Sequence, residues 1–216
     1  MEKEKSIKHL AIILDGNRRF AKRLMLEPWK GHEYGAEKIE KLFDWCRELG
    51  IKETTLYCFS IENFNRPKKE FRKVRSNERI EKNGIKIRFI GKKEMFDVEL
   101  RELIGELERW TKDNKEFVFN FCMAYGGRQE IVNAVKKMIE NREEINEENL
   151  KKNLCLESEP DLIIRTGGEK RLSNFLLFQS AYSEWVFLDK MWPEFEKQDL
   201  INAVWEFNKR ERRFGR

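Results

Sequence analysis

One block of the sequence combines the residue types that bind anions. The apolar run Asp161-Leu162-Ile163-Ile164 is followed directly by Arg165-Thr166-Gly167-Gly168-Glu169-Lys170-Arg171-Leu172-Ser173-Asn174. Guanidinium groups can hold phosphate oxygens through paired hydrogen bonds, and a glycine-containing turn exposes backbone N–H groups and leaves room for a phosphate. The block therefore predicts a diphosphate site where a strand ends.

Three other polar turns follow predicted strands in the same way. They are DGNRR at 15–19, SIENFNR at 60–66 and YGGR at 125–128. Open α/β sheets bind ligands at the carboxyl ends of their strands, so these turns should meet at one edge. Any one of them alone is more simply a helix cap or a tight turn. The four together favour one shared binding site.

Asp15 is the carboxylate best placed to bind a divalent cation, because it ends a strand and precedes Gly16. Mg²⁺ typically takes one or two carboxylates and completes its shell with water and phosphate oxygens. His32 follows Gly31 near a predicted helix start, where the helix dipole favours a phosphate. The alternative for His32 is a local hydrogen bond within its helix. One Asp with several Arg fits a clamp for a metal and a diphosphate.

Alternating short β-branched or aromatic runs and longer amphipathic segments position these turns. The predicted strands are 9–14, 54–59, 85–90, 116–124, 161–165 and 184–187. The predicted helices are 33–49, 68–82, 94–115, 128–141, 147–154, 172–181 and 197–212. This order predicts an α/β fold with a single open, mostly parallel sheet of about six strands flanked by helices.

Composition supports one domain across residues 1–216, since a chain of this length buries a core without splitting. With 44 cations and 39 anions, the net charge of +5 is too small to argue for a nucleic-acid partner. The cysteines form no C-x-x-C pair, and we expect buried free thiols in a reducing cytoplasm, with disulfides or a zinc site as alternatives. No apolar stretch is long enough for a membrane span, so we expect a soluble protein.

The chain is also rich in aromatic residues, with 16 Phe and 6 Trp. Most should lie in the core. A cationic rim beside an aromatic cavity nevertheless suits a substrate with a diphosphate head and a hydrocarbon tail. The sequence has no G-x-x-x-x-G-K-[ST] loop, no G-x-G-x-x-G turn and no Asp-Asp-x-x-Asp motif, which argues against common nucleotide sites and trans-type prenyl synthases.

The motifs as a set resemble the successive signatures of cis-prenyltransferases, the undecaprenyl and polyprenyl diphosphate synthases. They occur in family order across nearly the whole chain: 15–21, 31–32, 59–67, 125–128, 165–179, 182–184, 192–193 and 210–215. The resemblance implies the family fold with an apolar tunnel. It also implies consecutive cis-condensation of isopentenyl diphosphate onto an allylic prenyl diphosphate primer.

The resemblance further implies roles for individual residues. Asp15 would be catalytic and hold Mg²⁺, with Glu184 contributing to the metal site, and Asn63 would orient the homoallylic substrate and assist proton loss. The implied substrate-binding residues are Gly16, Asn17, Arg18, Arg19, Phe20, His32, Ser60, Glu62, Phe64, Arg66, Arg165, Arg171 and Ser173. The group that takes the proton is not assigned.

The resemblance also implies a homodimer in which the C-terminal tail, 207–216 with Arg213 and Gly215, reaches the partner's site. Without the family, a frayed basic tail would be the default interpretation. We expect no nucleic-acid partner, a cytoplasmic location and a peripheral membrane contact through the lipid product.

Three departures from the family pattern stand out. Pro28 occupies a place where the family often has Arg, leaving Lys30 or Arg23 to supply the contact, and Lys170 stands where bacterial members have His. Segment 67–84, the expected lid and tunnel wall, is short. Either the lid is truncated, or the sequence omits a mobile piece. Phe117 lies where bulk would close the tunnel floor, which predicts a product of restricted length.

Three other classes of protein are alternatives to a cis-prenyltransferase. A nucleic-acid-binding protein would show a continuous basic stripe. A phosphatase or phosphotransferase needs a nucleophile or a second metal carboxylate, and neither stands out. A non-catalytic subunit of a heteromeric family member would lack Asp15 or the Arg cluster.

Overall fold

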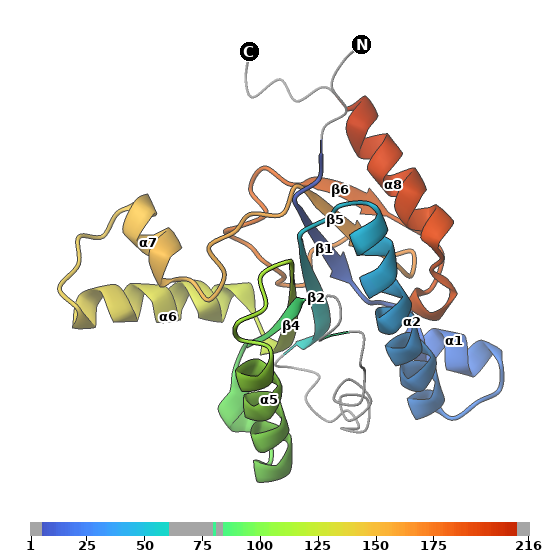
Figure 1. Cartoon of the computed structure of the whole chain (residues 1–216), viewed down its shortest axis with the longest axis horizontal. Helices are drawn as coiled ribbons and strands as arrows, with labels where there is room; N and C mark the ends of the chain where they lie inside the picture. Colours follow the sequence, from blue (N-terminus) through green and yellow to red (C-terminus); the bar gives the residue numbers. More distant parts are fainter. Residues whose placement is uncertain (1–5, 61–79, 81–83, 211–216) are drawn as a thin grey trace.

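A single six-stranded parallel sheet organises the molecule (Figure 1). The computed structural model describes residues 6–60, 80 and 84–210, without the side chains of Phe59 and Ser60. The strand order is β3-β4-β2-β1-β5-β6, and every pairing is parallel. The strands are β1 His9–Ile13, β2 Glu53–Ser60, β3 Ile85–Ile90, β4 Phe117–Tyr125, β5 Leu162–Arg165 and β6 Glu184–Phe187.

The described helices lie between the strands and after β6. They are α1 Asn17–Arg23, α2 Pro28–Glu48, α5 Val98–Trp110, α6 Gly127–Glu140, α7 Glu147–Asn153 and α8 Lys197–Lys209, with short 3-10 turns η2 Lys93–Met95 and η3 Trp192–Glu194. In Figure 1, α2 and α8 lie on the right of the sheet, while α6 and α7 extend to the left. The predicted fold class is therefore confirmed, with a sheet that is wholly parallel.

The two faces of the sheet bury different partners because strand side chains alternate. Leu10 and Ile12 of β1 belong to a large core with residues of α2, α5 and α8, among them Phe43, Ile104 and Phe207. On the other face, a smaller core lies beneath loops and includes Ala11, Ile13, Tyr57, Leu156, Phe175 and Leu176. The loop that follows β5 is thereby packed against the sheet.

One predicted helix is wrong. Residues 172–181 form a series of turns, in which Ser173, Asn174 and Leu176 have positive φ angles of 51°, 63° and 42°. The apolar residues Phe175 and Leu176 are fully buried in the smaller core, where they fill space under a loop. Their apolar pattern therefore reflects burial by a loop, which periodicity alone does not distinguish from a helix face.

Helix α1 was not predicted, because Gly16-Asn17-Arg18-Arg19 resembles a turn. Gly16 precedes it with φ 108°, and a Cβ there would lie 2.8 Å from the Met191 Cβ. Helix α2 begins at Pro28, five residues before the predicted start, since proline suits the first position of a helix. Helix α5 begins at Val98 because the Asp97 side chain accepts from the Leu100 N–H at 2.9 Å. Predicted helix 68–82 lies, apart from Ile80, outside the described residues.

The contact between α1 and α2 requires glycine at position 31. A Cβ on Gly31 would lie 2.0 Å from the Asn17 backbone oxygen, which cannot move without moving α1. Gly31→Ala is expected to lower the free energy of unfolding by about 2–4 kcal/mol, which is a fall of roughly 5–15 °C in Tm.

The matched control for this substitution is Gly105→Ala in α5, where a Cβ would meet only the flexible Arg109 side chain, 3.1 Å away. This change should raise Tm slightly, because alanine has the higher helix propensity. Equal effects of the two substitutions in a calorimetric scan would contradict the close packing of α1 on α2.

The cysteines are free thiols in this structure, and Cys46 and Cys122 are buried. Cys58 is half-buried, and Cys155 is exposed, so the expectation of uniformly buried thiols is wrong for Cys155. Burial raises the pKa of Cys46 from 9.0 to about 12 and raises that of Cys122 as well.

These shifts predict a loss of stability at high pH. When the pKa of a thiol is higher in the folded state than in the unfolded state, the protonated thiol stabilises the folded state. This stabilisation is complete below pH ~9 and is lost as the pH rises toward ~12. The free energy of unfolding should fall by up to about 1.4 kcal/mol per pH unit for each buried thiol. Urea unfolding at pH 8 to 11 measures this, and Cys46→Ala should show a shallower fall. If the free energy of unfolding of Cys46→Ala falls with pH as steeply as that of the unmodified chain, the Cys46 thiol is not the cause.

In the part of the chain that the structure describes, no helix combines the length and apolar character needed to cross a bilayer. Most of the expected lid, 67–84, and the tail from 211 onward lie outside the described residues. The tail's dimer role therefore stays a prediction.

Candidate functional site

The carboxyl edge of the sheet brings the first and last motifs together. Ile13, the last residue of β1, pairs in register with Arg165, the last residue of β5. Asp15 follows β1 after one residue, and its Oδ2 accepts a hydrogen bond from Arg165 Nη2 at 2.9 Å. Two motifs separated by 150 residues thus meet directly at the site.

Arg165 is almost wholly buried, with a side chain that is 3% exposed. Its Nη1 donates to Ser173 Oγ at 2.8 Å and to the Arg171 carbonyl oxygen. Its Nε–H is buried and has no hydrogen-bond partner among the described residues. A buried guanidinium retains its charge, so Arg165 is a fixed cation whose Nε–H donor is still unused.

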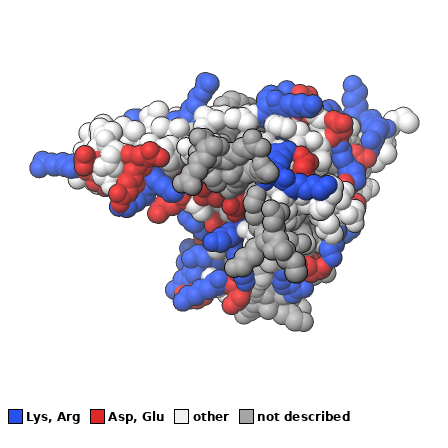
Figure 2. Space-filling view, turned by 90° about the horizontal axis from the view of Figure 1, so that it is seen from above, with Lys and Arg blue, Asp and Glu red and all other residues white. Residues whose placement is uncertain are grey.

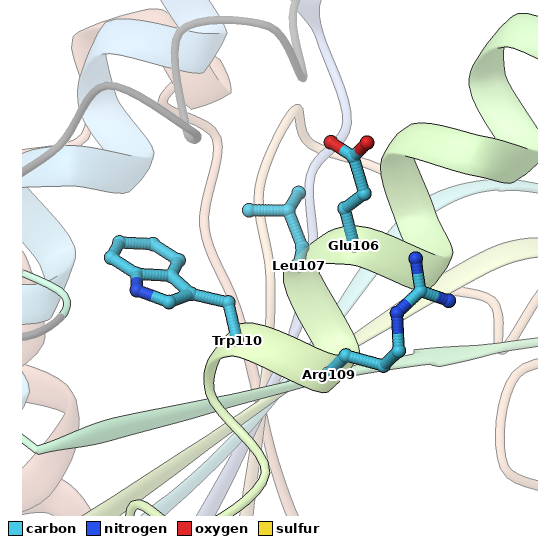
Figure 3. A pocket seen from close by; sticks show the side chains of 4 residues that line it. All are labelled: Glu106, Leu107, Arg109 and Trp110. Carbon is cyan, nitrogen blue, oxygen red and sulfur yellow. The ribbon is translucent and has the colours of Figure 1, made fainter.

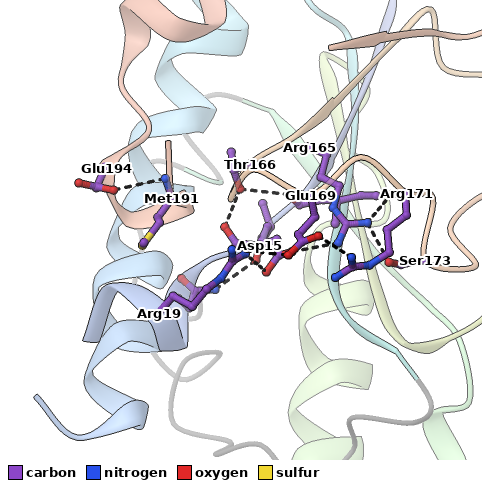
Figure 4. A network of polar contacts seen from close by, with 12 residues as sticks. Asp15, Arg19, Arg165, Thr166, Glu169, Arg171, Ser173, Met191 and Glu194 are labelled. Carbon is purple, nitrogen blue, oxygen red and sulfur yellow. Dashed lines mark hydrogen bonds and ion pairs between the residues drawn. The ribbon is translucent and has the colours of Figure 1, made fainter. Parts of the chain in front are cut away.

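A polar network surrounds this pair (Figure 4). Arg19 lies on the other side of Asp15, with Nη2 3.2 Å from Oδ1, and Arg171 donates to Glu169 Oε2 at 2.5 Å. Thr166 Oγ1 donates to the Asp15 carbonyl oxygen at 2.8 Å. Both oxygens of the Asp15 carboxylate therefore face cations, and its backbone is fixed by the neighbouring loop.

Gly167 is needed where this loop crosses Asp15. Its φ is +87°, and a Cβ would lie 2.6 Å from Arg19 Nη2 and 3.1 Å from the Asp15 carbonyl carbon. Any side chain there would push Arg19 away from Asp15. The glycine pair at 167–168 thus allows the two motifs to approach each other.

A hollow of about 210 Å³ lies beside the network. Its described lining residues are Leu14, Asp15, Gly16, Asn17, Arg18, Arg19 and His32. Every residue predicted from the first motif except Phe20 is therefore in this lining, together with His32 from α2. Phe20 instead packs edge-on against Tyr34, with ring centroids 5.5 Å apart. His32 is buried and lies in the second turn of α2.

Glu130, a buried carboxylate that sequence reasoning missed, links the YGGR turn to the loop after β5. Glu130 Oε2 accepts from Tyr125 OH at 2.5 Å and from Gln179 Nε2 at 3.1 Å. Its Oε1 accepts from the Cys155 N–H at 2.9 Å. Burial and the adjacent carboxylate raise the pKa of Tyr125, which keeps the phenol a donor. The only sequence signal was an acidic residue in the first turn of α6.

The loop that carries Ser173 is anchored to the same turn. Asn174 accepts from the N–H of Gly127 at 2.8 Å through its backbone oxygen and from the N–H of Arg128 at 2.9 Å through Oδ1. Tyr57 OH contacts the carbonyl oxygens of Tyr125 and Ser173, both at 3.2 Å. The left-handed backbone at Ser173 and Asn174 is therefore held by several contacts at once.

The structure does not bring Glu184 to Asp15 within one chain. Glu184 begins β6 and pairs in register with Leu162, three residues before Arg165, so it lies toward the amino edge of the sheet. Its carboxylate pairs with Arg210 Nη1 at 2.8 Å. A shared metal site of these two carboxylates within the monomer is not formed here.

Several predicted site residues cannot be placed. Glu62, Asn63, Phe64 and Arg66 lie outside the described residues, as do Arg213 and Gly215, and the Ser60 side chain is not described. Of the two lysines considered as substitutes, Lys30 pairs with Glu33 at 3.0 Å and Lys170 is exposed. Their predicted roles stay predictions.

The described residues offer limited ligands for a metal. No three of their His, Cys, Asp and Glu side chains form a cluster that could hold an ion. Asp15 is the acidic side chain lining the hollow, and it is partly accessible, at 28%. This set fits a hard cation that keeps water and takes substrate phosphate oxygens. It does not form a closed protein cage.

A second hollow, of about 360 Å³, lies at the C-terminal end of α5. Figure 3 shows Glu106, Leu107, Arg109 and Trp110 around it, with the Trp110 indole extending away from the helix. This described lining is mixed in character. It does not by itself establish the expected apolar tunnel, which stays a prediction.

The fold and the site together define an α/β protein with an arginine-rich polar site at the carboxyl edge of a parallel sheet. The family model described as "Putative undecaprenyl diphosphate synthase" matches residues 13–215. The chain belongs to this family of cis-prenyltransferases, enzymes that elongate prenyl chains.

Curated relatives agree with this assignment. A tritrans,polycis-undecaprenyl-diphosphate synthase (geranylgeranyl-diphosphate specific) from Methanopyrus kandleri is 46% identical over 228 residues, covering 96% of this chain and 84% of the relative. An isoprenyl transferase from Thermus thermophilus is 42% identical over 233 residues, covering 97% and 89%.

Solved structures agree as well. Lavandulyl diphosphate synthase from Lavandula x intermedia, in complex with dimethylallyl diphosphate, has a TM-score of 0.87 at 30% identity, covering 98% of this chain and 99% of that one. A probable undecaprenyl diphosphate synthase from Campylobacter jejuni has a TM-score of 0.81 at 36% identity, covering 98% and 100%.

Proposed function

We propose that this enzyme catalyses the Mg²⁺-dependent, consecutive cis-condensation of isopentenyl diphosphate with an allylic prenyl diphosphate primer, giving a polyprenyl diphosphate. The observation that carries the proposal is the contact between Asp15 and Arg165, which joins in one site two motifs that are predicted to bind diphosphate. Geranylgeranyl diphosphate is the proposed primer, since the relative from Methanopyrus kandleri is named as specific for it.

The primer's diphosphate is assigned to the hollow beside Asp15. Arg18 and Arg19 line it with exposed side chains, and cations there offset the negative charge that grows on the leaving oxygen as the allylic C–O bond breaks. A bound Mg²⁺, held by Asp15 and phosphate oxygens, would neutralise part of that same charge.

Isopentenyl diphosphate is assigned to the other side of Arg165. The Ser173 hydroxyl and the exposed Arg171 are donors that suit phosphate oxygens, and the buried Arg165 guanidinium adds positive charge beside them. Because Arg165 contacts both Asp15 and Ser173, its guanidinium would fix the separation between the two substrates. Such positioning converts an encounter of two substrates into a reaction within one complex.

The test is incubation of the purified enzyme with Mg²⁺, radiolabelled isopentenyl diphosphate and primers of several lengths. Products are analysed for chain length and double-bond geometry. The proposal requires elongated products whose new double bonds are cis, with geranylgeranyl diphosphate as the best primer. Omission of Mg²⁺, with a chelator present, should abolish elongation. Label that stays in isopentenyl diphosphate, or trans products, would overturn the proposal.

Phe117 is the residue expected to limit product length. It begins β4 at the amino edge of the sheet, far along the strand from the diphosphate site, and its ring packs under Lys52 Nζ at 4.6 Å. Phe117→Ala should shift the product distribution by at least one isoprene unit, because removing the ring opens space for the growing chain. An unchanged distribution on thin-layer chromatography would exclude Phe117 as the tunnel floor.

A further inference from the structure

The loop between α1 and α2 exposes an unusual run of apolar side chains. Met25 is 95% exposed, and Leu24, Leu26 and Trp29 are 47%, 36% and 43% exposed. Met25 also has a φ of 54°, a backbone conformation that side chains of its size rarely adopt. Apolar residues are thus held in solvent at the tip of a short loop, where the hydrophobic effect disfavours them.

Cations flank these apolar side chains. Residues 18–30 carry five Lys and Arg and one acidic residue, Glu27, while Arg23 and Lys30 also pair with Glu194 and Glu33 at 2.5 and 3.0 Å. Lys22 is exposed, Arg23 and Lys30 have side chains that are 51% and 43% exposed, and Lys30 Nζ lies 4.3 Å from the centre of the Trp29 ring. An exposed Trp beside basic residues is the composition that membrane interfaces favour.

The loop also has the shape of an insertion element. In Figure 1, α1 and the loop after it lie at the right-hand extremity of the molecule, away from the sheet. Figure 2 shows blue, red and white atoms together at this end of the molecule. A projecting tip can enter a soft surface that a flat patch would only touch.

The exposed apolar area is large enough for a peripheral membrane contact. The exposed parts of these four side chains amount to on the order of 400 Å². The strength of such a contact comes from a small apolar insertion together with attraction to anionic lipid.

We propose that residues 22–30 dock this protein on the surface of an anionic lipid bilayer, with Leu24, Met25 and Leu26 inserted and Lys22, Arg23 and Lys30 at the headgroups. Helix α1 has seven residues and connects this loop to Arg18 and Arg19 of the site. The diphosphate hollow would then stand only about 10 Å from the docked surface.

Flotation with vesicles tests the proposal. The protein is mixed with vesicles of phosphatidylcholine, or of phosphatidylcholine with phosphatidylglycerol, without substrate. The full chain should float with the phosphatidylglycerol vesicles, and at least fivefold less with neutral ones or in 0.5 M salt, since a salt concentration of about that size screens the attraction. Leu24→Ser/Met25→Ser should reduce flotation about tenfold, and Lys22→Ser should reduce it severalfold.

The matched control is Ile139→Ser/Ile145→Ser, which removes two side chains that are 61% and 66% exposed near α6 and α7. This variant should float like the unmodified chain. Melting curves and synthase activity on dispersed substrates check that each variant is folded. Because the vesicles contain no substrate, this result does not depend on the reaction proposed above.

Three outcomes would overturn the proposal: no flotation of the full chain with either vesicle, flotation unaffected by the loop double substitution, or an equal loss in the control. If the full chain is instead an oligomer in solution that Leu24→Ser/Met25→Ser dissociates, the loop contacts a second copy and the proposal of a lipid surface is wrong.

Discussion

Asp15→Asn is expected to reduce kcat on the order of a thousandfold. Asparagine keeps the shape of the side chain but loses the negative charge that faces Arg165 and Arg19 and that would hold Mg²⁺. Substitution of a residue that acts mainly on the charge developing in the transition state should lower kcat more than it raises KM. Single-turnover measurement with radiolabelled isopentenyl diphosphate gives the chemical step directly.

The same substitution should also affect folding, because Arg165 is buried and would lose its acidic partner. We expect a decrease of about 1–3 kcal/mol in the free energy of unfolding. Glu157→Gln, which neutralises an exposed carboxylate away from the site, is the matched control and should change neither quantity. If Asp15→Asn keeps more than a tenth of the turnover, Asp15 does not have the proposed role.

Arg165→Lys is expected to lower kcat/KM for isopentenyl diphosphate on the order of a hundredfold. The guanidinium donates to Asp15 through one nitrogen and to Ser173 through another, and a single ammonium group cannot reproduce that fork. KM should rise more for isopentenyl diphosphate than for the primer, because the hydrogen bond from residue 165 to Ser173, on the isopentenyl diphosphate side, is the one that the substitution weakens. Initial rates with each substrate varied separately distinguish the two effects.

Arg88→Lys provides the control for this substitution. Arg88 lies on β3 and donates to the Cys155 carbonyl oxygen at 3.2 Å, outside the site. The Arg88→Lys variant should have both KM values within about twofold of those of the unmodified enzyme, as expected for a surface change. Equal increases in both KM values for Arg165→Lys would show that Arg165 does not separate the two substrates.

The sheet was predictable because central strands such as β1 and β5 are buried on both faces. Runs such as Leu162-Ile163-Ile164 have few alternatives to a central parallel strand, and all six predicted strands agree with the structure within a residue at each end. The carboxyl ends of parallel strands meet at one edge, which predicted that Asp15 and Arg165 lie together. What the strand pattern could not predict is strand order, which depends on long-range pairing.

The loop after β5 shows where such reasoning ends. Its apolar residues Phe175 and Leu176 favoured a helix. Two hydrogen bonds hold the loop in another conformation: Asn174 accepts from a backbone N–H of α6, and Gln179 donates to Glu130. These hydrogen-bond partners are distant in sequence, so a local sequence pattern cannot predict the contacts. Glu184 is similar, because only the register of β6 against β5 reveals that it lies away from Asp15.

The central position of β1 has a consequence for biosynthesis. β1 pairs with β2 soon after it in the sequence, but its other neighbour is β5, and the N–H groups of Lys8 and His9 bond to Asp161 at 2.8 and 3.0 Å. A nascent chain on the ribosome therefore holds one edge of its first strand unpaired until residue 165 has emerged. Such an edge can associate with other chains, and closing it late makes folding slow. Chaperone dependence during synthesis would follow from this strand order, and catalytic competence would be the last property the growing chain acquires.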